Sequence, residues 1–123
     1  MPKFATTSSV LRDLCRLSIP AVKETIKEVL DGIAPKEQSE FNLQPTMAPK
    51  ISKLDGKLDF NLHIDQISAR YRALVHSPGV FANLDNQRIK FEELDFQKES
   101  MSSSKAGQII ITGKDMFIAA KDG

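Results

Sequence analysis

The stretch GVFANLDNQRIKFEELDF, residues 79–96, predicts a β-hairpin in the second half of the chain. Apolar residues lead up to Asp85-Asn86, a dipeptide that tolerates the tight turn between two antiparallel strands. Beyond the turn, Ile89 and Phe91 alternate with basic residues, which is the period of a strand with one buried face. We therefore expect this hairpin to form part of a β-rich domain.

The residues on either side of the hairpin predict the other elements of this domain. A short strand is expected at 57–60, where apolar and polar residues alternate. A helix is expected at about 64–75, where apolar residues recur at helical spacing. After a polar loop, a second hairpin is expected from 109–111 and 116–119.

Residues 1–33 predict a helical arm made of two short helices. Apolar residues recur every three to four positions on both sides of Ser18-Ile19-Pro20, where the first helix is expected to break. Pro20 would then stand in the first turn of the second helix, where a missing N–H leaves no partner unsatisfied. Asp31-Gly32 is expected to end that helix, because glycine readily enters the left-handed region.

The segment 34–49 is interspersed with proline and polar residues and predicts an extended linker. The predicted organisation is a helical arm at 1–33, this linker, and a domain at 50–123. The fold class expected from these elements is α+β, with one helix inside the β-rich part.

Bulk composition restricts the possible partners only weakly. With 17 basic and 16 acidic residues, the net charge of +1 does not by itself indicate a nucleic-acid partner. No apolar run approaches the roughly 20 residues that a membrane span needs, so no membrane contact is expected. Cys15 is the single cysteine, which excludes an internal disulfide. Residues 1–18 fit either a mitochondrial transit peptide or a short amphipathic helix, and the helix is favoured.

No group of residues predicts a catalytic or metal site. His63 and His76 are not at a metal-ligand spacing, and one distant cysteine completes no zinc pattern. The isolated glycines form no phosphate-cradling loop, so no cofactor is expected. The acids Glu92, Glu93 and Asp95 fit either paired catalytic carboxylates or a solvated strand face, and the solvated face is favoured.

Lysine and arginine residues cluster near the start of the domain and recur in the elements that follow. The candidates for phosphate contact are Lys50, Lys53, Lys57, Arg70, Arg72, Arg88 and Lys90. Such side chains bind backbone phosphates, and binding then releases counterions. A solubilising run of lysines is the alternative. The aromatic residues of the domain fall on apolar faces, so a nucleic acid would be bound through its backbone and shape rather than through stacked bases.

Four motifs follow one another along the chain. They are APKISKLDGKLDF at 48–60, RYRAL at 70–74, SPGVFANLDNQRIKFEE at 77–93 and GQIIITGKDMFIAAKDG at 107–123. In this order they resemble the C-terminal domain of the methionyl-tRNA formyltransferase family, whose typical arm reads Tyr-Ala-x-Lys-Ile-Ser-Lys-x-Asp-Gly-x-Ile-Asp-Trp. The stretch 14–38, which includes IPAVKETIKEVLDG, resembles the family's connecting helix. The resemblance covers nearly the whole chain, and its arm is the most specific part.

The resemblance implies an OB-like β-barrel that helps to hold initiator tRNA through basic residues. It matches Lys50, Lys53 and Lys57 to the family's basic arm, and Arg72 to the arginine of the family's Ile-Arg-Ala. In the family, a Rossmann-like domain transfers a formyl group from formyl-tetrahydrofolate to the methionine on that tRNA. This catalytic domain has no counterpart here, so the resemblance implies no catalytic residue and no cofactor, and it leaves open whether the chain is an enzyme.

The sequence also departs from the family pattern. Phe60 replaces Trp, Tyr71 replaces Ile, Lys121 replaces Gly, and the residues at 75–78 replace Asn-Pro-Trp-Pro. Because the chain stops at the turn Asp122-Gly123, the family's last strand is expected to be missing. The barrel would then be partly open, with an unpaired sheet edge that invites self-association.

Two other functions stay open at this stage. The chain resembles, less closely, the C-terminal domain of other formyltransferase-superfamily enzymes, such as formyltetrahydrofolate dehydrogenase or a sugar formyltransferase. It could also be a protein-interaction module that uses the open sheet edge. The poor match at 75–77 and the truncation favour a divergent eukaryotic copy of the family and hence a mitochondrial location, with the bacterial cytoplasm as the alternative.

Overall fold

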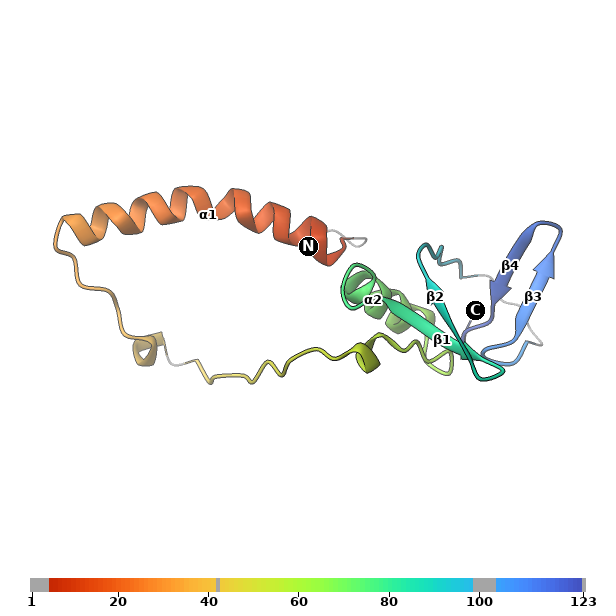
Figure 1. The fold of residues 1–123 in the computed structure, drawn as a ribbon. Helices are drawn as coiled ribbons and strands as arrows, with labels where there is room; N and C mark the ends of the chain where they lie inside the picture. The colour runs from red at the N-terminus through yellow and green to blue at the C-terminus, as the bar shows by residue number, and fades with distance from the viewer. Residues whose placement is uncertain (1–4, 42, 99–103, 123) are drawn as a thin grey trace. The chain divides into compact units, whose positions relative to one another are not determined.

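The structure, a computed structural model, describes residues 5–41, 43–98 and 104–122. The described part divides into two compact units, Ser8–Lys50 and a domain that combines 5–7 with 51–122. Helices and two small antiparallel sheets occur together, which confirms the α+β class (Figure 1). The elements are α1 (Thr7–Leu30), η1 (Gln38–Phe41), η2 (Lys53–Gly56), α2 (Ile64–Leu74), β1 (Val80–Leu84), β2 (Gln87–Phe91), β3 (Ile109–Thr112) and β4 (Asp115–Ile118).

Helix α1 runs without interruption through Pro20, so the predicted break at this proline is wrong (Figure 1). Proline removes one backbone hydrogen bond from a helix interior and costs about 3 kcal/mol there. The apolar residues on the two sides of Pro20 nevertheless share one face. Leu11 and Val22, for example, are separated by about three helical turns. Continuing the helix keeps this stripe in phase, and a break would divide it.

The predicted end of the helix at Asp31-Gly32 is confirmed. Gly32 has φ 74° and its N–H donates to the carbonyl of Val29, while the N–H of Ile33 donates to the carbonyl of Glu28. These bonds satisfy carbonyls that the last turn would otherwise leave unpaired. In the described residues that follow, up to Lys50, the one regular element is the short 3-10 helix η1.

Both predicted hairpins are present. Strands β1 and β2 pair from Val80↔Phe91 to Leu84↔Gln87, and the two residues between them, Asp85 and Asn86, have φ 46° and 66°. Positive φ at both central positions is the geometry of the turn whose twist suits a hairpin. Strands β3 and β4 pair in the same antiparallel manner. In the part of the chain that the structure describes, the two hairpins form separate two-stranded sheets and close no barrel.

The predicted strand at 57–60 is reduced to a single bridge. Lys57 bridges to Phe81 of β1 in parallel, and the N–H of Leu58 donates to the carbonyl of Phe81 over 2.8 Å. A turn follows at once, because the carboxylate of Asp59 accepts the backbone N–H of Asn61 over 3.0 Å. The 3-10 helix η2 on one side and this turn on the other leave too few extended residues for a strand.

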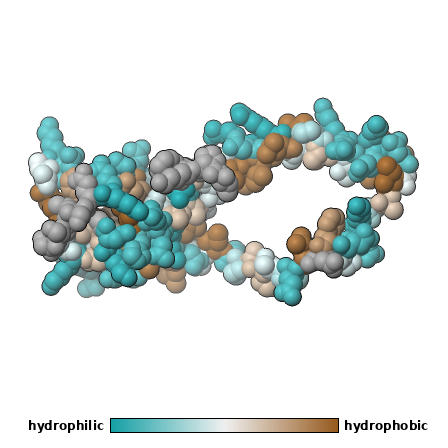
Figure 2. Space-filling view, turned by 180° about the vertical axis from the view of Figure 1, so that it is seen from behind, coloured by the Kyte–Doolittle hydropathy of each residue, from teal (hydrophilic) through white to brown (hydrophobic). Residues whose placement is uncertain are grey.

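The core of the domain lies between α2, the first hairpin and the residues after β4. It is formed by Leu58, Ile64, Ile67, Leu74, Val80, Phe91 and Ala120. Helix α2 matches the predicted helix, and Ile64, Ile67 and Leu74 form its buried face. Burying one such side chain stabilises a domain by about 1.5–3 kcal/mol. Hydrophilic side chains make up most of the domain surface that Figure 2 shows.

Helix α2 is held at its start by a residue far along the chain. The carboxylate of Asp122 accepts the backbone N–H of Ile64 over 2.7 Å and lies 3.1 Å from Nδ1 of His63. These contacts, chiefly the bond from Ile64, hold the pKa of Asp122 below its usual value of 3.8. The bond therefore stabilises the fold at neutral pH.

We expect Asp122→Asn to lower the free energy of unfolding at neutral pH and to have less effect in acid. A carboxylate whose pKa is lowered by folding stabilises the native state above its unfolded pKa. That stability is lost as the pH falls below 3.8 and through the lowered folded pKa. Urea unfolding of both proteins from about pH 7 to pH 2 measures the difference. Asp13→Asn on α1 is the matched control, and a difference that stays constant into acid would contradict the assignment.

Candidate nucleic-acid interface

The basic arm begins with a tightly closed turn. The backbone N–H and the hydroxyl of Ser52 both donate to one carboxylate oxygen of Asp55, over 2.6 and 2.8 Å. These two hydrogen bonds hold the pKa of Asp55 below its usual value. The one acid of the turn is thus used to close the 3-10 helix η2, and Lys53 and Lys57 lie exposed at its two ends.

The turn is fixed to the first hairpin at a close approach of two backbones. Gly56 is buried, and a Cβ atom added to it would overlap the carbonyl oxygen of Gly79. Only glycine allows the two backbones to come so near. The next residue, Lys57, then bridges to Phe81 in β1. The side chain of Lys57 therefore starts from a defined backbone position rather than from a free linker.

Arg70 of helix α2 stabilises this turn through hydrogen bonds to two of its carbonyl groups. Its Nη1 donates to the carbonyl of Lys57 over 3.2 Å and to that of Asp55 over 3.4 Å. The guanidinium is exposed and always charged, so it can bind these carbonyls and still present donors to solvent.

Phe81 lies under a group of cationic side chains. Its ring is buried, and the guanidinium carbon of Arg88 lies 3.6 Å from the ring centroid. Lys57 bridges to Phe81 on one side and Lys90 pairs with it on the other. Opposite residues of adjacent strands share one face, so these cations lie together. We call Lys57, Arg88 and Lys90 the basic face, and Arg70 adjoins it through its hydrogen bond to the carbonyl of Lys57.

Three carboxylates lie near these cations. Asp59 interacts electrostatically with Lys57 and Arg70, and Asp55 does so with Arg70. Nζ of Lys90 lies 3.8 Å from Oε1 of Glu92, and both side chains are well exposed. Such an exposed pair is worth about 0–1 kcal/mol, so a phosphate can replace the carboxylate at little cost.

Two of the predicted site residues belong neither to the basic face nor to the turn beside it. Arg72 is half-buried, and it donates through Nε to the carbonyl of Ser68 over 3.3 Å and through Nη1 to that of Ala5 over 3.5 Å. Lys50 is the last residue of the Ser8–Lys50 unit. The structure therefore brings together three of the seven predicted cations around Phe81. Arg70 is hydrogen-bonded to the adjoining turn, and Lys53 begins that turn.

Sequence reasoning missed two parts of this arrangement. The sequence predicts a core position for Phe81, as for the other aromatic residues of the domain, but its ring also contacts the guanidinium of Arg88. Arg70 stabilises the turn through hydrogen bonds to the carbonyls of Asp55 and Lys57. These are tertiary contacts, and no local sequence pattern predicts them. The closure by Ser52 and Asp55 did leave a signal, the spacing of an N-terminal capping box.

Other chemistry has no support within the described residues. No three His, Cys, Asp or Glu residues come together there in a way that could hold a metal ion. Nor does any helix within 5–41, 43–98 or 104–122 have the length and hydropathy of a membrane span. The acids Glu92, Glu93 and Asp95 are all exposed, in agreement with the solvated face predicted for them.

Comparison with known proteins assigns the family. Residues 50–123 match the family model described as the formyl transferase C-terminal domain, and the chain therefore belongs to this family. The methionyl-tRNA formyltransferase of Francisella tularensis subsp. tularensis (strain WY96-3418) is 36% identical over 118 residues, which cover 94% of this chain and 36% of that protein. The enzyme of subsp. novicida (strain U112) is 35% identical over the same length. The chain spans about a third of the length of these relatives, and the resemblance seen in the motifs is confirmed.

Proposed function

We propose that this chain contributes the tRNA-contacting C-terminal part of a methionyl-tRNA formyltransferase, with initiator tRNA as its partner. The observation that carries the proposal is the basic face around Phe81, with Lys53 and Lys57 at the two ends of the turn that Arg70 fastens. Relatives named methionyl-tRNA formyltransferase support it, because their similarity extends over both the arm and the domain.

The geometry suits recognition of a phosphate backbone. Cations on a short turn, on strand β2 and on helix α2 are presented from fixed backbone positions, which lowers the entropy lost when phosphates bind. The aromatic residues nearest to them are occupied: Phe81 lies under Arg88, and Phe91 packs edge-on against Phe60. Binding would therefore depend on backbone charge and shape, and it would be strongly sensitive to salt.

Three finer assignments belong to the same proposal. The two hairpins and the parallel bridge at Lys57 are compatible with part of an OB-like barrel. Formyl transfer is proposed to need the remaining length of the relatives, of which this chain spans about a third. For the location, the bacterial relatives support the bacterial cytoplasm, the alternative predicted from the sequence, rather than mitochondria.

The test is binding of initiator tRNA to the full chain at two salt concentrations. Changing Lys53, Lys57 and Lys90 together to alanine is expected to weaken binding and to reduce the salt slope by about 3, one for each lost phosphate contact. The logarithm of the binding constant against the logarithm of salt concentration, from filter binding or fluorescence anisotropy, gives the slope directly.

The matched control changes Lys23, Lys27 and Lys36, which are exposed in the other unit, to alanine. Both triple variants lose the same net charge, so equal effects on the slope would mean non-specific attraction and would contradict the proposal. Tyr71 is the only tyrosine and tryptophan is absent, so intrinsic fluorescence reports whether the domain is folded in each variant.

A further inference from the structure

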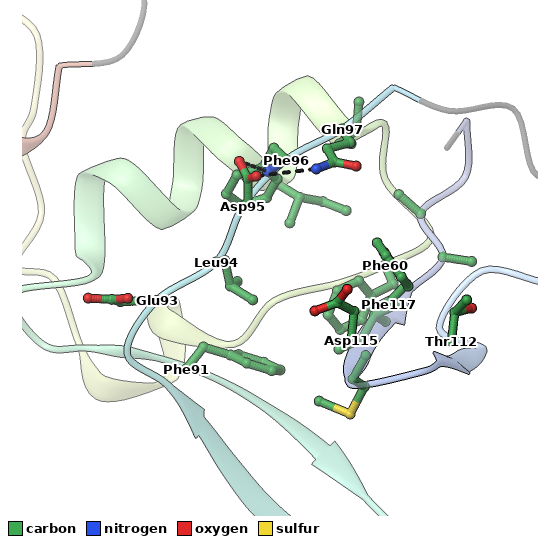
Figure 3. Close-up of a pocket in the computed structure, with 16 residues that line it drawn as sticks. Phe60, Phe91, Glu93, Leu94, Asp95, Phe96, Gln97, Thr112, Asp115 and Phe117 are labelled. Carbon is green, nitrogen blue, oxygen red and sulfur yellow. Dashed lines mark hydrogen bonds between the residues drawn. The ribbon is translucent and has the colours of Figure 1, made fainter.

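The side of the first hairpin that faces away from the core carries Arg88 over the ring of Phe81. On the core side, Phe91 belongs to the core cluster, and Figure 3 shows its ring extending towards the strand that carries Phe117. Phe81 pairs with the residue before Phe91, and successive side chains of a strand point to opposite sides, so Phe81 lies on the other side. There its ring is 4% exposed, because Arg88 covers it.

The guanidinium of Arg88 is stacked on this ring. Its central carbon lies 3.6 Å from the ring centroid, which is the contact distance of two carbon atoms. An edge-on guanidinium would place a nitrogen between this carbon and the ring and would hold the carbon farther away. Since the guanidinium is planar, Phe81 covers one of its faces and leaves the second face towards solvent.

No acid or carbonyl competes for this second face within the part of the chain that the structure describes. Arg88 is exposed there and forms no ion pair or hydrogen bond with a described residue. By contrast, Arg70 and Arg72 both donate to backbone carbonyls. Arg88 is therefore held in place by the ring and keeps its donors and its outer face for a ligand.

The residues beside Arg88 can bind the other parts of a nucleotide. Asn83 stands directly opposite Arg88 in the hairpin register, and opposite residues share one face of a sheet. Its exposed amide offers both a donor and an acceptor to the edge of a base. Lys90 stands opposite Phe81, and Lys57 bridges to the same residue, so cations for phosphate lie next to the stacked pair.

We propose that Arg88, supported by Phe81, is a stacking platform for an unpaired base of the bound RNA, with adenine favoured. The base lies on the outer face of the guanidinium, Asn83 binds its edge, and Lys57 and Lys90 meet the adjoining phosphates. A base inside a duplex is stacked on both sides, so it cannot occupy the platform. Adenine is favoured because an amide pairs with its N6 donor and N7 acceptor. This inference rests on the proposed function and adds a base contact to it.

The test uses the full chain and three labelled RNA strands in fluorescence anisotropy at one salt concentration. The strands have equal length and identical flanks, and their central positions carry adenine, uracil or abasic ribose, so all three have the same charge. We expect the adenine strand to bind about tenfold more tightly than the abasic strand, as one stacked base supplies, and more tightly than the uracil strand. Equal binding of the adenine and abasic strands, or no binding of any strand, would overturn the proposal.

Variants assign the base contact to the platform. Arg88→Lys retains the positive charge and removes the planar group, so it is expected to bring the affinities for the adenine and abasic strands towards equality. Asn83→Ala is expected to reduce the preference for adenine over uracil. Arg12→Lys, at an exposed position of α1, is the matched control and should leave both affinity ratios unchanged. A ratio that Arg88→Lys does not change would contradict the platform, and the fluorescence of Tyr71 reports whether each variant is folded.

The platform and the proposed function can fail separately. If the triple lysine variant lowers the salt slope for initiator tRNA while the adenine and abasic strands bind equally, the tRNA contact stands and the platform is overturned. If the adenine preference depends on Arg88 while the lysines leave the slope for tRNA unchanged, the platform stands and the proposed tRNA contact is overturned.

Discussion

Gly56→Ala is expected to destabilise the domain by at least about 3 kcal/mol, the upper range for inserting a methyl group into a packed site. The added Cβ would overlap the carbonyl oxygen of Gly79. Both partners belong to the backbone, so no side-chain rotation can relieve the contact. A domain of this size is stable by about 5–15 kcal/mol, so the loss is a large fraction of the total.

Urea unfolding followed by the fluorescence of Tyr71 measures this loss, and α1 does not contribute to the signal because it carries no tyrosine or tryptophan. Lys53→Ala in the same 3-10 helix is the control. It removes an exposed side chain and should change the free energy of unfolding by less than about 0.5 kcal/mol. A Gly56→Ala domain as stable as the original would show that η2 and the first hairpin do not approach so closely.

Phe81→Ala is expected to cost about 3–5 kcal/mol of unfolding free energy, the usual range for removing a buried ring. The side chain is only 4% exposed, and its loss leaves a cavity beneath Arg88. The same change removes the support of the basic face, so tRNA binding should fall even at temperatures where the domain remains folded. Urea unfolding and tRNA anisotropy measure the two effects separately.

Phe81→Leu retains most of the buried volume and removes the ring, so it should cost less than about 1.5 kcal/mol. Combining Phe81→Leu with Arg88→Ala in a double-mutant cycle isolates the contact between guanidinium and ring, expected at about 0.5–1 kcal/mol. If the two changes simply add, Arg88 does not depend on the ring, and the support of the basic face lies elsewhere.

Local signals predicted those elements whose cause is local. The turn at Asp85-Asn86 and helix α2 were found because turn chemistry and apolar spacing act within a few residues. The break predicted at Pro20 is wrong because a proline alone does not show whether a helix continues beyond it. None of the residues of α1 is buried, so packing of its apolar stripe does not explain the continuation. The strand predicted at 57–60 failed because alternation does not reveal how far a turn on each side extends.

The candidate site could be predicted only as a list of cations. Their charge is visible in the sequence, but their gathering depends on the bridge from Lys57 to Phe81 and on the register that sets Lys90 opposite the same residue. Both contacts join segments that are distant along the chain. Arg72 is held apart from the basic face by hydrogen bonds to the carbonyls of Ser68 and Ala5, and the sequence alone does not predict the contact with Ala5.

The hydrogen bond from Ile64 to Asp122 joins residues 58 positions apart, and so it bears on how the domain folds as well as on its stability. Helix α2 can begin to form early, because its own bonds are local, but its first turn lacks this partner until the second hairpin has been synthesised and has docked. A ribosome-bound chain that stops short of Asp122 would therefore carry a helix that frays at its N-terminus. The turn at Asp122 therefore completes the first turn of helix α2, although the two segments lie far apart along the chain.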